Sequence, residues 1–466
     1  MTQAVPLSAE NAVTASNKKK LGVWMCSALV VGNMIGSGIF LLPATLASYG
    51  TISLGGWLFT GAGAVLLALV FSRMSQVVPS TGGPYTYSRV GLGKFMGFLI
   101  AWGYWIGLWS GNAAIVVAMV GYLGIFFPQV VENPMLGAGV AISAIWLITW
   151  VNCRGVQSAG KFQLITTILK LLPLALVTFA GLFYINPEHF SAANFNISGE
   201  GNFAALSSTA ALCLWAFLGL ESACVPSEDV ENPKRTIPMA TTLGTLFAAV
   251  LYIIATVSLM GLIDPSTLAN STAPFADAAN QLVGPAGAMI VGLGAIISCL
   301  GALNGWTLMA AQIPMAASRD GLFPSIFGKL SSKGVPAGGI IISSILVSLL
   351  VAANFNKGLV GAFNFIISLA VMTTLLPYTM TTISKLVLMM GRHDKSGKPM
   401  LETKDIVITS LAFLYSLWAL AGSGQETVYW GFLLLIAGIP VYALIEWQKR
   451  KGQSEEFVLP AVTLQD

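Results

Sequence analysis

The sequence has very little charge. Asp, Glu, Lys and Arg together make up 9% of the 466 residues, whereas hydrophobic residues make up 55%. A soluble globular chain carries about 25% charged residues. Because so few polar side chains could not cover a water-exposed surface, the composition excludes a soluble enzyme. The same hydrophobicity excludes an intrinsically disordered chain.

The residues of metal sites and disulfides are also scarce. The chain has two His and five Cys. The five Cys are scattered, without the spacing of a zinc site or a disulfide framework. We therefore expect no metal and no cofactor, and we expect no nucleic-acid partner. The lack of any His, Cys or carboxylate cluster also argues against a membrane-embedded enzyme.

What the sequence does have is long apolar runs. A helix that spans a bilayer needs roughly 20 apolar residues, and twelve such stretches recur between short polar loops. The expected spans are residues 21–48, 52–76, 94–127, 135–153, 162–185, 206–225, 238–262, 284–315, 337–354, 359–391, 405–423 and 427–447. The sequence thus predicts an all-α membrane protein with twelve transmembrane helices and the lipid bilayer as its surroundings.

The basic residues indicate an orientation, because Lys and Arg collect in cytoplasmic loops. If residues 1–20, which include Lys18, Lys19 and Lys20, lie in the cytoplasm, then 21 of the 23 basic residues fall on that side. Of the other two, Lys357 lies in an outer loop and Lys170 lies inside a span. We therefore expect both termini to be cytoplasmic.

Two ionisable side chains, Lys170 and Glu221, lie deep inside expected spans. Such residues are costly in lipid and are usually functional, although a hydrogen bond between helices is the structural alternative. Lys385 also lies in an apolar stretch, but it is close enough to a helix end for its ammonium group to reach the interface.

Two expected spans contain a break in the helical pattern. In the first, Ser37 stands between two glycines, each of which weakens a helix by about 1 kcal/mol. The sixth contains Gly219 just before Glu221. Irregular backbone at this depth is tolerated where it lines a cavity, and paired breaks indicate a transporter site. Free N–H groups around Ser37 would suit a carboxylate, although close helix packing is the alternative.

Three further side chains indicate a ligand with a cationic group. Trp215 and Trp306 lie too deep for an interfacial aromatic belt, whereas Trp24 and Trp57 suit one. A Trp face in a desolvated cavity holds a cation by about 2 kcal/mol. The Asn112 side chain would bond an amine or guanidinium group, or else a neighbouring helix.

Several motifs resemble those of a known family. They are GNMIGSGIFLLPA (32–44), GGPYTY (82–87), LWAFLGLESA (214–223), ENPKR (231–235) and RDGLFP (319–324). Through them the chain resembles the amino acid–polyamine–organocation transporters over nearly its full length. It is most similar to the bacterial exchangers of arginine with agmatine, lysine with cadaverine and ornithine with putrescine.

The resemblance implies the five-plus-five inverted-repeat fold of the leucine transporter, followed by two further helices. The implied divisions are a cytoplasmic tail (1–20), a first repeat of five spans (21–190), a second repeat (200–391), spans eleven and twelve (405–447) and a second cytoplasmic tail (448–466). It also implies the bacterial cytoplasmic membrane and a homodimer.

The resemblance further implies roles for individual side chains. Matched to substrate binding are Asn33, Met34, Ile35, Gly36, Ser37, Gly38, Asn112, Trp215, Ala216, Leu218, Trp306 and Ala370. Matched to gating are Tyr104, Glu221 and Tyr378. Lys170 resembles a lysine that replaces a sodium ion in proton-coupled relatives.

Departures from the family pattern leave the substrate open. Leu108, Ala216 and Ala370 stand where the arginine exchangers have small polar residues, and the nearest exchangers lack Lys170. The leading interpretation is alternating-access exchange of arginine, lysine or ornithine for a related amino acid or amine. The second is proton-coupled uptake of a neutral or broad range of amino acids, with Lys170 titrating. A non-transporting receptor or scaffold is disfavoured because it needs neither paired breaks nor Glu221.

Overall fold

The computed structural model of the chain describes residues 22–452, apart from 81, 155–156, 226, 228–229, 355–356, 394–396, 398 and 423. For residues 157–165, 421 and 452 it describes the backbone alone. The expected N-terminal tail (1–20) and residues 453–466 of the expected C-terminal tail lie outside the described residues. The first part of the latter tail, residues 448–452, continues the last helix.

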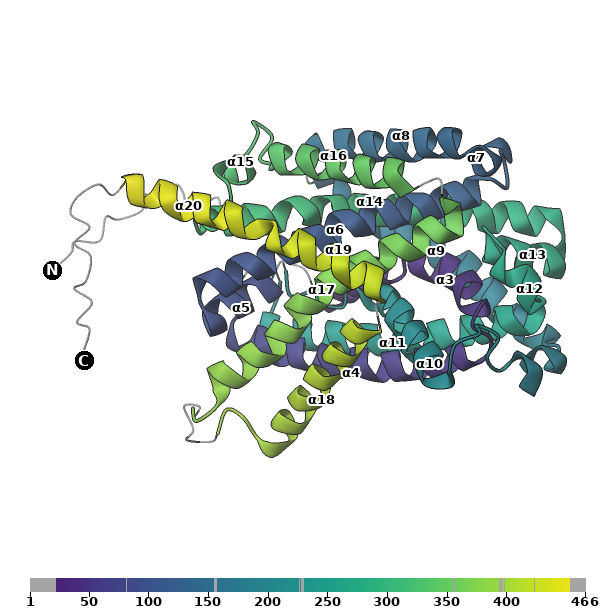
Figure 1. Cartoon of the computed structure of the whole chain (residues 1–466), viewed down its shortest axis with the longest axis horizontal. Coiled ribbons are helices and arrows are strands. Elements are labelled where there is room, and N and C mark those ends of the chain that lie inside the picture. Colours follow the sequence, from purple (N-terminus) through teal and green to yellow (C-terminus); the bar gives the residue numbers. More distant parts are fainter. Residues whose placement is uncertain are drawn as a thin grey trace.

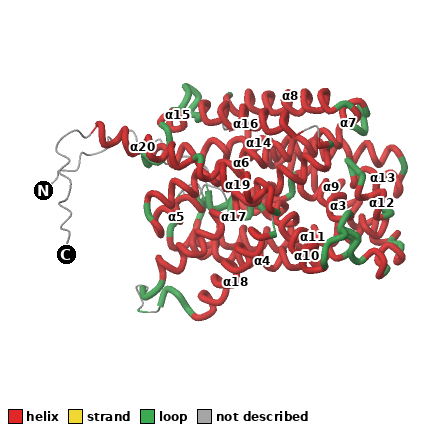
Figure 2. The backbone as a smooth tube through the Cα atoms, in the orientation of Figure 1, coloured by secondary structure: helices red, strands yellow, loops and turns green. Residues whose placement is uncertain are grey.

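The described residues form helices and no β-strand. Most helices follow the long axis of the molecule, and most loops collect at its two ends (Figures 1 and 2). Within the described part of the chain, eleven segments are long and apolar enough to cross a membrane. They comprise α2 (Val23–Met34) with α3 (Ser37–Ala47), α4 (Ile52–Val77), α6 (Lys94–Leu123), α8 (Pro134–Cys153), α9 (Gln157–Gly181), α11 (Pro233–Leu262), α14 (Pro285–Arg319), α16 (Ala337–Asn354), α17 (Leu359–Met389), α18 (Thr403–Ala421), and α19 (Gln425–Ile436) with α20 (Gly438–Gly452).

The sixth expected span, residues 206–225, is only half helical. Helix α10 (Asn202–Leu214) passes into one 3-10 turn, η5 (Trp215–Phe217), and residues 218–225 are a series of turns. The apolar helix in this region, Asn202–Phe217, is therefore shorter than a full span. The break expected at Gly219 is present, because the backbone of residues 218–225 turns instead of continuing the helix.

Short helices at the ends of the long ones were not expected from the sequence. They are α5 (Pro84–Leu92), α7 (Gln129–Glu132), η2 (Leu182–Tyr184), η3 (Pro187–Phe190), η4 (Ala192–Asn194), α12 (Pro265–Ala269), α13 (Pro274–Val283) and α15 (Ser325–Gly328). Several begin with proline, whose fixed φ suits the first helical position. Such short, partly polar helices contain no long apolar run that would mark them in the sequence.

Helix α6 is the central element of the bundle, and 94% of its apolar stretch is buried. It packs against α14 and α17, while α11 packs against α4. Helices α8 and α16 lie side by side along one edge, α18 packs on α4 and α17, and α19 with α20 crosses α6 (Figure 1). The broken segments α2–α3 and α10–η5 thus lie within a frame of long, continuous helices.

Two side chains that were assigned to membrane interfaces are buried between helices. Trp57 is 0% exposed and packs against Phe217 and Tyr252, with ring centroids 6.0 and 5.2 Å away. Lys385 is 1% exposed and forms a 3.0 Å ion pair with Asp405 of α18. Both assignments were wrong because neighbouring helices cover these positions. Trp24, by contrast, is exposed.

The breaks of the first and sixth segments pack directly against each other. Between α2 and α3 the residues Ile35 and Gly36 leave the helix. Gly219 has a φ of +105°, and a Cβ added to it would lie 3.1 Å from the Cβ of Asn33. Both the backbone conformation and the close approach therefore require glycine at this position.

We expect Gly219→Ala to lower the thermal stability of the purified protein. A non-glycine residue in such a conformation costs about 1–3 kcal/mol, and contact with Asn33 adds to that cost. Gly199→Ala is the matched control, because Gly199 also has a positive φ (+78°) but has no heavy atom within 4 Å of an added Cβ. Equal losses of melting temperature in the two variants would contradict close packing of the two breaks.

Candidate functional site

Side chains from three directions hold the end of α2. The Asn33 Nδ2 group donates to Ser222 Oγ at 2.8 Å and approaches Met309 Sδ at 3.8 Å. From α9, Lys170 Nζ donates to the carbonyl oxygen of Gly32 at 2.6 Å. This contact falls at Gly32, just before Asn33 at the end of α2.

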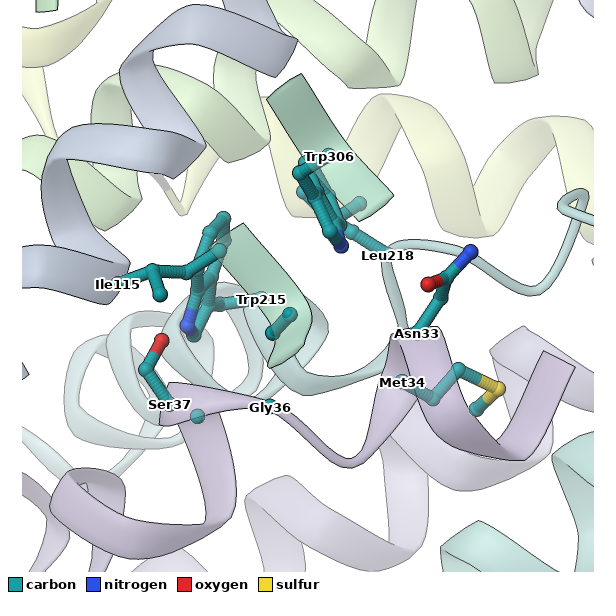
Figure 3. A pocket seen from close by; sticks show the side chains of 10 residues that line it. Asn33, Met34, Gly36, Ser37, Ile115, Trp215, Leu218 and Trp306 are labelled. Atoms are coloured by element: carbon teal, nitrogen blue, oxygen red, sulfur yellow. The ribbon is translucent and has the colours of Figure 1, made fainter. Parts of the chain in front are cut away.

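A small closed cavity lies where the two breaks meet. Its volume is about 10 Å³, which holds about one water molecule. It is lined by Asn33, Met34, Gly36, Ser37, Gly38, Ile115, Trp215, Leu218, Ala302 and Trp306 (Figure 3). Eight of the twelve side chains predicted to bind substrate are in this set. The cavity is too small for an amino acid, so the structure represents a closed form.

The other four predicted substrate-binding residues lie outside the cavity lining. They are Ile35, Asn112, Ala216 and Ala370. Ala216 lies behind the lining: its Cα is 3.3 Å from the place of a Cβ on Gly38, and its carbonyl accepts a 3.0 Å hydrogen bond from Tyr252. The carbonyl of Ala370 faces Gly107 of α6. These two positions support the helices around the cavity in the closed form.

Asn112 is buried, and its Oδ1 atom has no hydrogen-bond partner among the described residues. Its neighbour Gly111 faces the two tryptophans: an added Cβ would lie 3.0 Å from Trp215 Cη2 and 3.0 Å from Trp306 Cζ3. Asn112 is therefore adjacent to the cavity, and movement of these rings would be needed for a ligand to reach it.

Sequence reasoning missed two residues that line the cavity, Ile115 and Ala302. Ile115 follows Asn112 by three positions on α6, and Ala302 precedes Trp306 by four positions on α14. Residues with these spacings lie on the same face of a helix. Helical spacing from the two predicted residues is therefore the signal that would have found both.

The end of the cavity at α3 offers free hydrogen-bonding groups. Ser37 Oγ and Trp215 Nε1 are buried without a partner among the described residues. Figure 3 shows both groups beside the start of α3. The first N–H groups of a helix lack partners within it, and the helix dipole there favours an anion. This end of the cavity can therefore bind a carboxylate.

A second wall of the cavity is aromatic. The rings of Trp215 and Trp306 have centroids 5.7 Å apart and planes tilted by 45°. Two glycines leave room for the Trp215 ring. A Cβ added to Gly38 would lie 3.1 Å from Trp215 Cδ1, and one added to Gly111 would lie 3.0 Å from Trp215 Cη2. A larger side chain at either glycine would displace the ring. The two tryptophans occupy this side of the cavity.

The three predicted gate residues meet in one buried cluster. Tyr104 of α6 donates its hydroxyl proton to Glu221 Oε1, and Tyr378 of α17 donates to Glu221 Oε2 at 2.5 Å. The backbone N–H of Gly219 also donates to Oε2, at 3.2 Å. Three donors thus surround the carboxyl group, and no basic side chain pairs with it among the described residues. The cluster joins the broken sixth segment to two continuous helices.

Comparison with known families distinguishes a transporter from a membrane-embedded enzyme. The family described as amino acid permease matches residues 21–444. The chain belongs to the amino acid permease family. The permease is therefore a multi-pass membrane transporter and not an enzyme.

Curated relatives of the permease include polyamine transporters. A cadaverine/lysine antiporter of Escherichia coli is 37% identical over 78% of this chain and 82% of its own length. Putrescine transporters of Escherichia coli and Haemophilus influenzae are each 32% identical over 93% of this chain, and the matches cover 98% and 99% of their lengths.

We expect Glu221→Gln to slow turnover of the permease while leaving equilibrium binding of substrate nearly unchanged. Tyr104 and Tyr378 donate to different carboxylate oxygens, and glutamine replaces one of these oxygens with an NH2 group, so one tyrosine loses its acceptor. Loss of a hydrogen bond to a charged group costs about 1.5–3 kcal/mol. If this bond forms in the rate-limiting step, its loss slows turnover at least about tenfold. The pH dependence of turnover should change as well, because the variant has no titrating carboxyl group.

Tyr104→Phe is the companion variant, since it removes one donor and keeps the carboxyl group with Tyr378 and Gly219. We expect a smaller loss of turnover from it. Measurements of binding affinity and initial transport rate on both variants separate the roles. A large loss of affinity with normal turnover in Glu221→Gln would show that this side chain binds substrate instead of acting in a gate.

Proposed function

We propose that the permease exchanges a cationic amino acid for a related amino acid or amine across the bacterial cytoplasmic membrane by alternating access. The observation that carries this proposal is the cavity between the two breaks, which has a carboxylate-binding end at Ser37 and an aromatic wall at Trp215 and Trp306. Among substrates of this class, lysine and cadaverine are the first to test, because a relative is a cadaverine/lysine antiporter.

The aromatic wall suits an exchanger of molecules that differ in net charge. None of the ten residues that line the cavity is acidic. An ammonium group would therefore be held mainly by the tryptophan faces, at about 2 kcal/mol when desolvated. Lysine would use both ends of the cavity. Cadaverine, which lacks the carboxylate, would use the aromatic wall and leave the N–H groups of α3 free.

The proposed mechanism needs the broken segments to move relative to the continuous helices. Breaks at corresponding positions support an inverted repeat, with 21–190 as the first half and 200–391 as the second. The basic loops support cytoplasmic termini. We also propose, from resemblance alone, that the permease forms a homodimer.

A second candidate function is proton-coupled uptake of neutral amino acids. The observation that favours it is the fully buried ammonium group of Lys170, whose described acceptor is the Gly32 carbonyl at the end of α2. Loss of the proton would weaken this contact and free α2 to move. A buried lysine in this place therefore offers a route by which protonation could be coupled to the transport cycle.

The two candidates predict different requirements for uptake by proteoliposomes containing the purified permease. If the protein is an exchanger, we expect rapid uptake of labelled cadaverine into vesicles loaded with lysine and little uptake into empty vesicles. The reason is that return of the site without substrate is slow. Vesicles loaded with an equal concentration of sucrose are the osmotic control.

One result of this experiment would contradict exchange, and another would favour proton-coupled uptake. Uptake of cadaverine at equal rates into loaded and empty vesicles would contradict exchange. Uptake of alanine into empty vesicles, driven by an inward proton gradient and abolished in Lys170→Ala, would favour the proton-coupled candidate.

A further inference from the structure

A second cavity, far larger than the central one, lies near the ends of α3, α10, α17 and α18. Its volume is about 440 Å³, within the range of small-molecule sites. It is lined by Tyr49, Glu200, Ser208, Ala211, Leu212, Lys357, Gly361, Asn364, Phe365, Ser368, Gly422, Gly424, Glu426 and Thr427. In the orientation proposed above it faces the outside. None of the residues predicted to bind substrate or to form the gate lines it.

The charged groups of this outer cavity sum to one negative charge. Lys357 is already engaged: its Nζ lies 3.7 Å from Glu426 Oε1 and 4.0 Å from the centroid of the Phe365 ring. Glu426 therefore offsets the one ammonium group in the lining. Glu200 has no basic partner among the described residues. Its carboxylate is the uncompensated charge of the cavity.

Glu200 is held in place by its own loop and by α10. Its Oε2 atom accepts a 3.3 Å hydrogen bond from Ser208 Oγ, and its backbone carbonyl accepts from Asn196 Nδ2 at 2.9 Å. Burial, and after it the charge of Glu200, raise the pKa of the nearby Tyr49 hydroxyl. Glu200 thus presents a carboxylate beside an aromatic ring and a hydroxyl group, which together suit an ammonium group.

The outer and central cavities are lined by adjoining parts of the chain. On α10, Leu212 of the outer cavity is three residues from Trp215, or roughly 4.5 Å along the helix. On α17, Asn364 of the outer cavity accepts a 2.7 Å hydrogen bond from Thr45 of α3. Thr45 lies eight residues after Ser37 on α3, or roughly 12 Å. The Thr45–Asn364 contact therefore joins the helices between the two cavities.

We propose that the outer cavity is a second, weaker binding site that takes the ammonium group of a cationic substrate on Glu200 before the substrate passes to the central cavity. This inference rests on the proposed function, because an uncompensated carboxylate attracts a substrate with net positive charge more than one with no net charge. The site raises the local concentration of cations on one side of the membrane alone. Its effect on transport is therefore asymmetric.

The test is uptake of labelled cadaverine from the two sides of the membrane, measured in intact cells and in inside-out vesicles. In Glu200→Gln we expect KM for uptake into cells to rise about three- to fivefold, the range of one partly exposed ion pair. The maximal rate, and KM in inside-out vesicles, should stay unchanged. Glu200→Asp keeps the charge and should restore most of the affinity.

Glu132→Gln is the matched control, since Glu132 is an exposed acid of α7 that does not line the outer cavity. An equal rise of KM in Glu132→Gln would show a general surface-charge effect and overturn the proposal. So would an unchanged KM in Glu200→Gln, or an equal rise from both sides. If the wild-type permease takes up no cadaverine or lysine, the proposed function fails and this site fails with it. Normal wild-type exchange with an unaffected Glu200→Gln contradicts the outer site alone.

Discussion

The structure depends on hydrogen bonding of broken backbone in the middle of a membrane. Each unpaired N–H or C=O group in lipid costs several kcal/mol, so a broken helix needs partners from elsewhere. Here Glu221 accepts from the backbone N–H of Gly219, and a side-chain hydrogen bond from Asn33 to Ser222 joins the two breaks. Lys170 takes the carbonyl of Gly32 from outside. We propose that the N–H groups at the start of α3 bind a ligand.

This arrangement links the substrate site to the surrounding helices. Asn33 of α2 bonds Ser222, which is next to Glu221 in the chain. A movement of α2 would therefore alter the hydrogen bonds of Glu221 with Tyr104 and Tyr378. Those tyrosines lie on α6 and α17, which are continuous helices. The two broken segments can therefore move together, and a few hydrogen bonds connect them to the continuous helices. Such bonds can be broken and remade in a transport cycle more readily than an extensive apolar interface.

Much of this could be predicted from the sequence, for specific reasons. Long apolar runs predicted the spans, and the cost of charge in lipid singled out Lys170 and Glu221, which are both buried. The break in the sixth segment was expected from Gly219 just before Glu221, but its extent over residues 218–225 was not, because these residues are mostly apolar. Trp57 and Lys385 were misplaced because sequence position along a span does not show which face meets lipid. Ile115 and Ala302 carry no polar signal, so only the geometry of α6 and α14 reveals them.

The central claim is that the break before α3 holds the carboxylate of the substrate. It is tested most directly by hydrogen–deuterium exchange at the amides of Ser37, Gly38 and Ile39, measured with saturating lysine and with saturating cadaverine. The two ligands differ by the carboxylate alone. We expect lysine to slow exchange at these amides far more than cadaverine does, with similar protection by both ligands around Trp306. Equal protection at Ser37 by the two ligands, or none by lysine, would contradict the account.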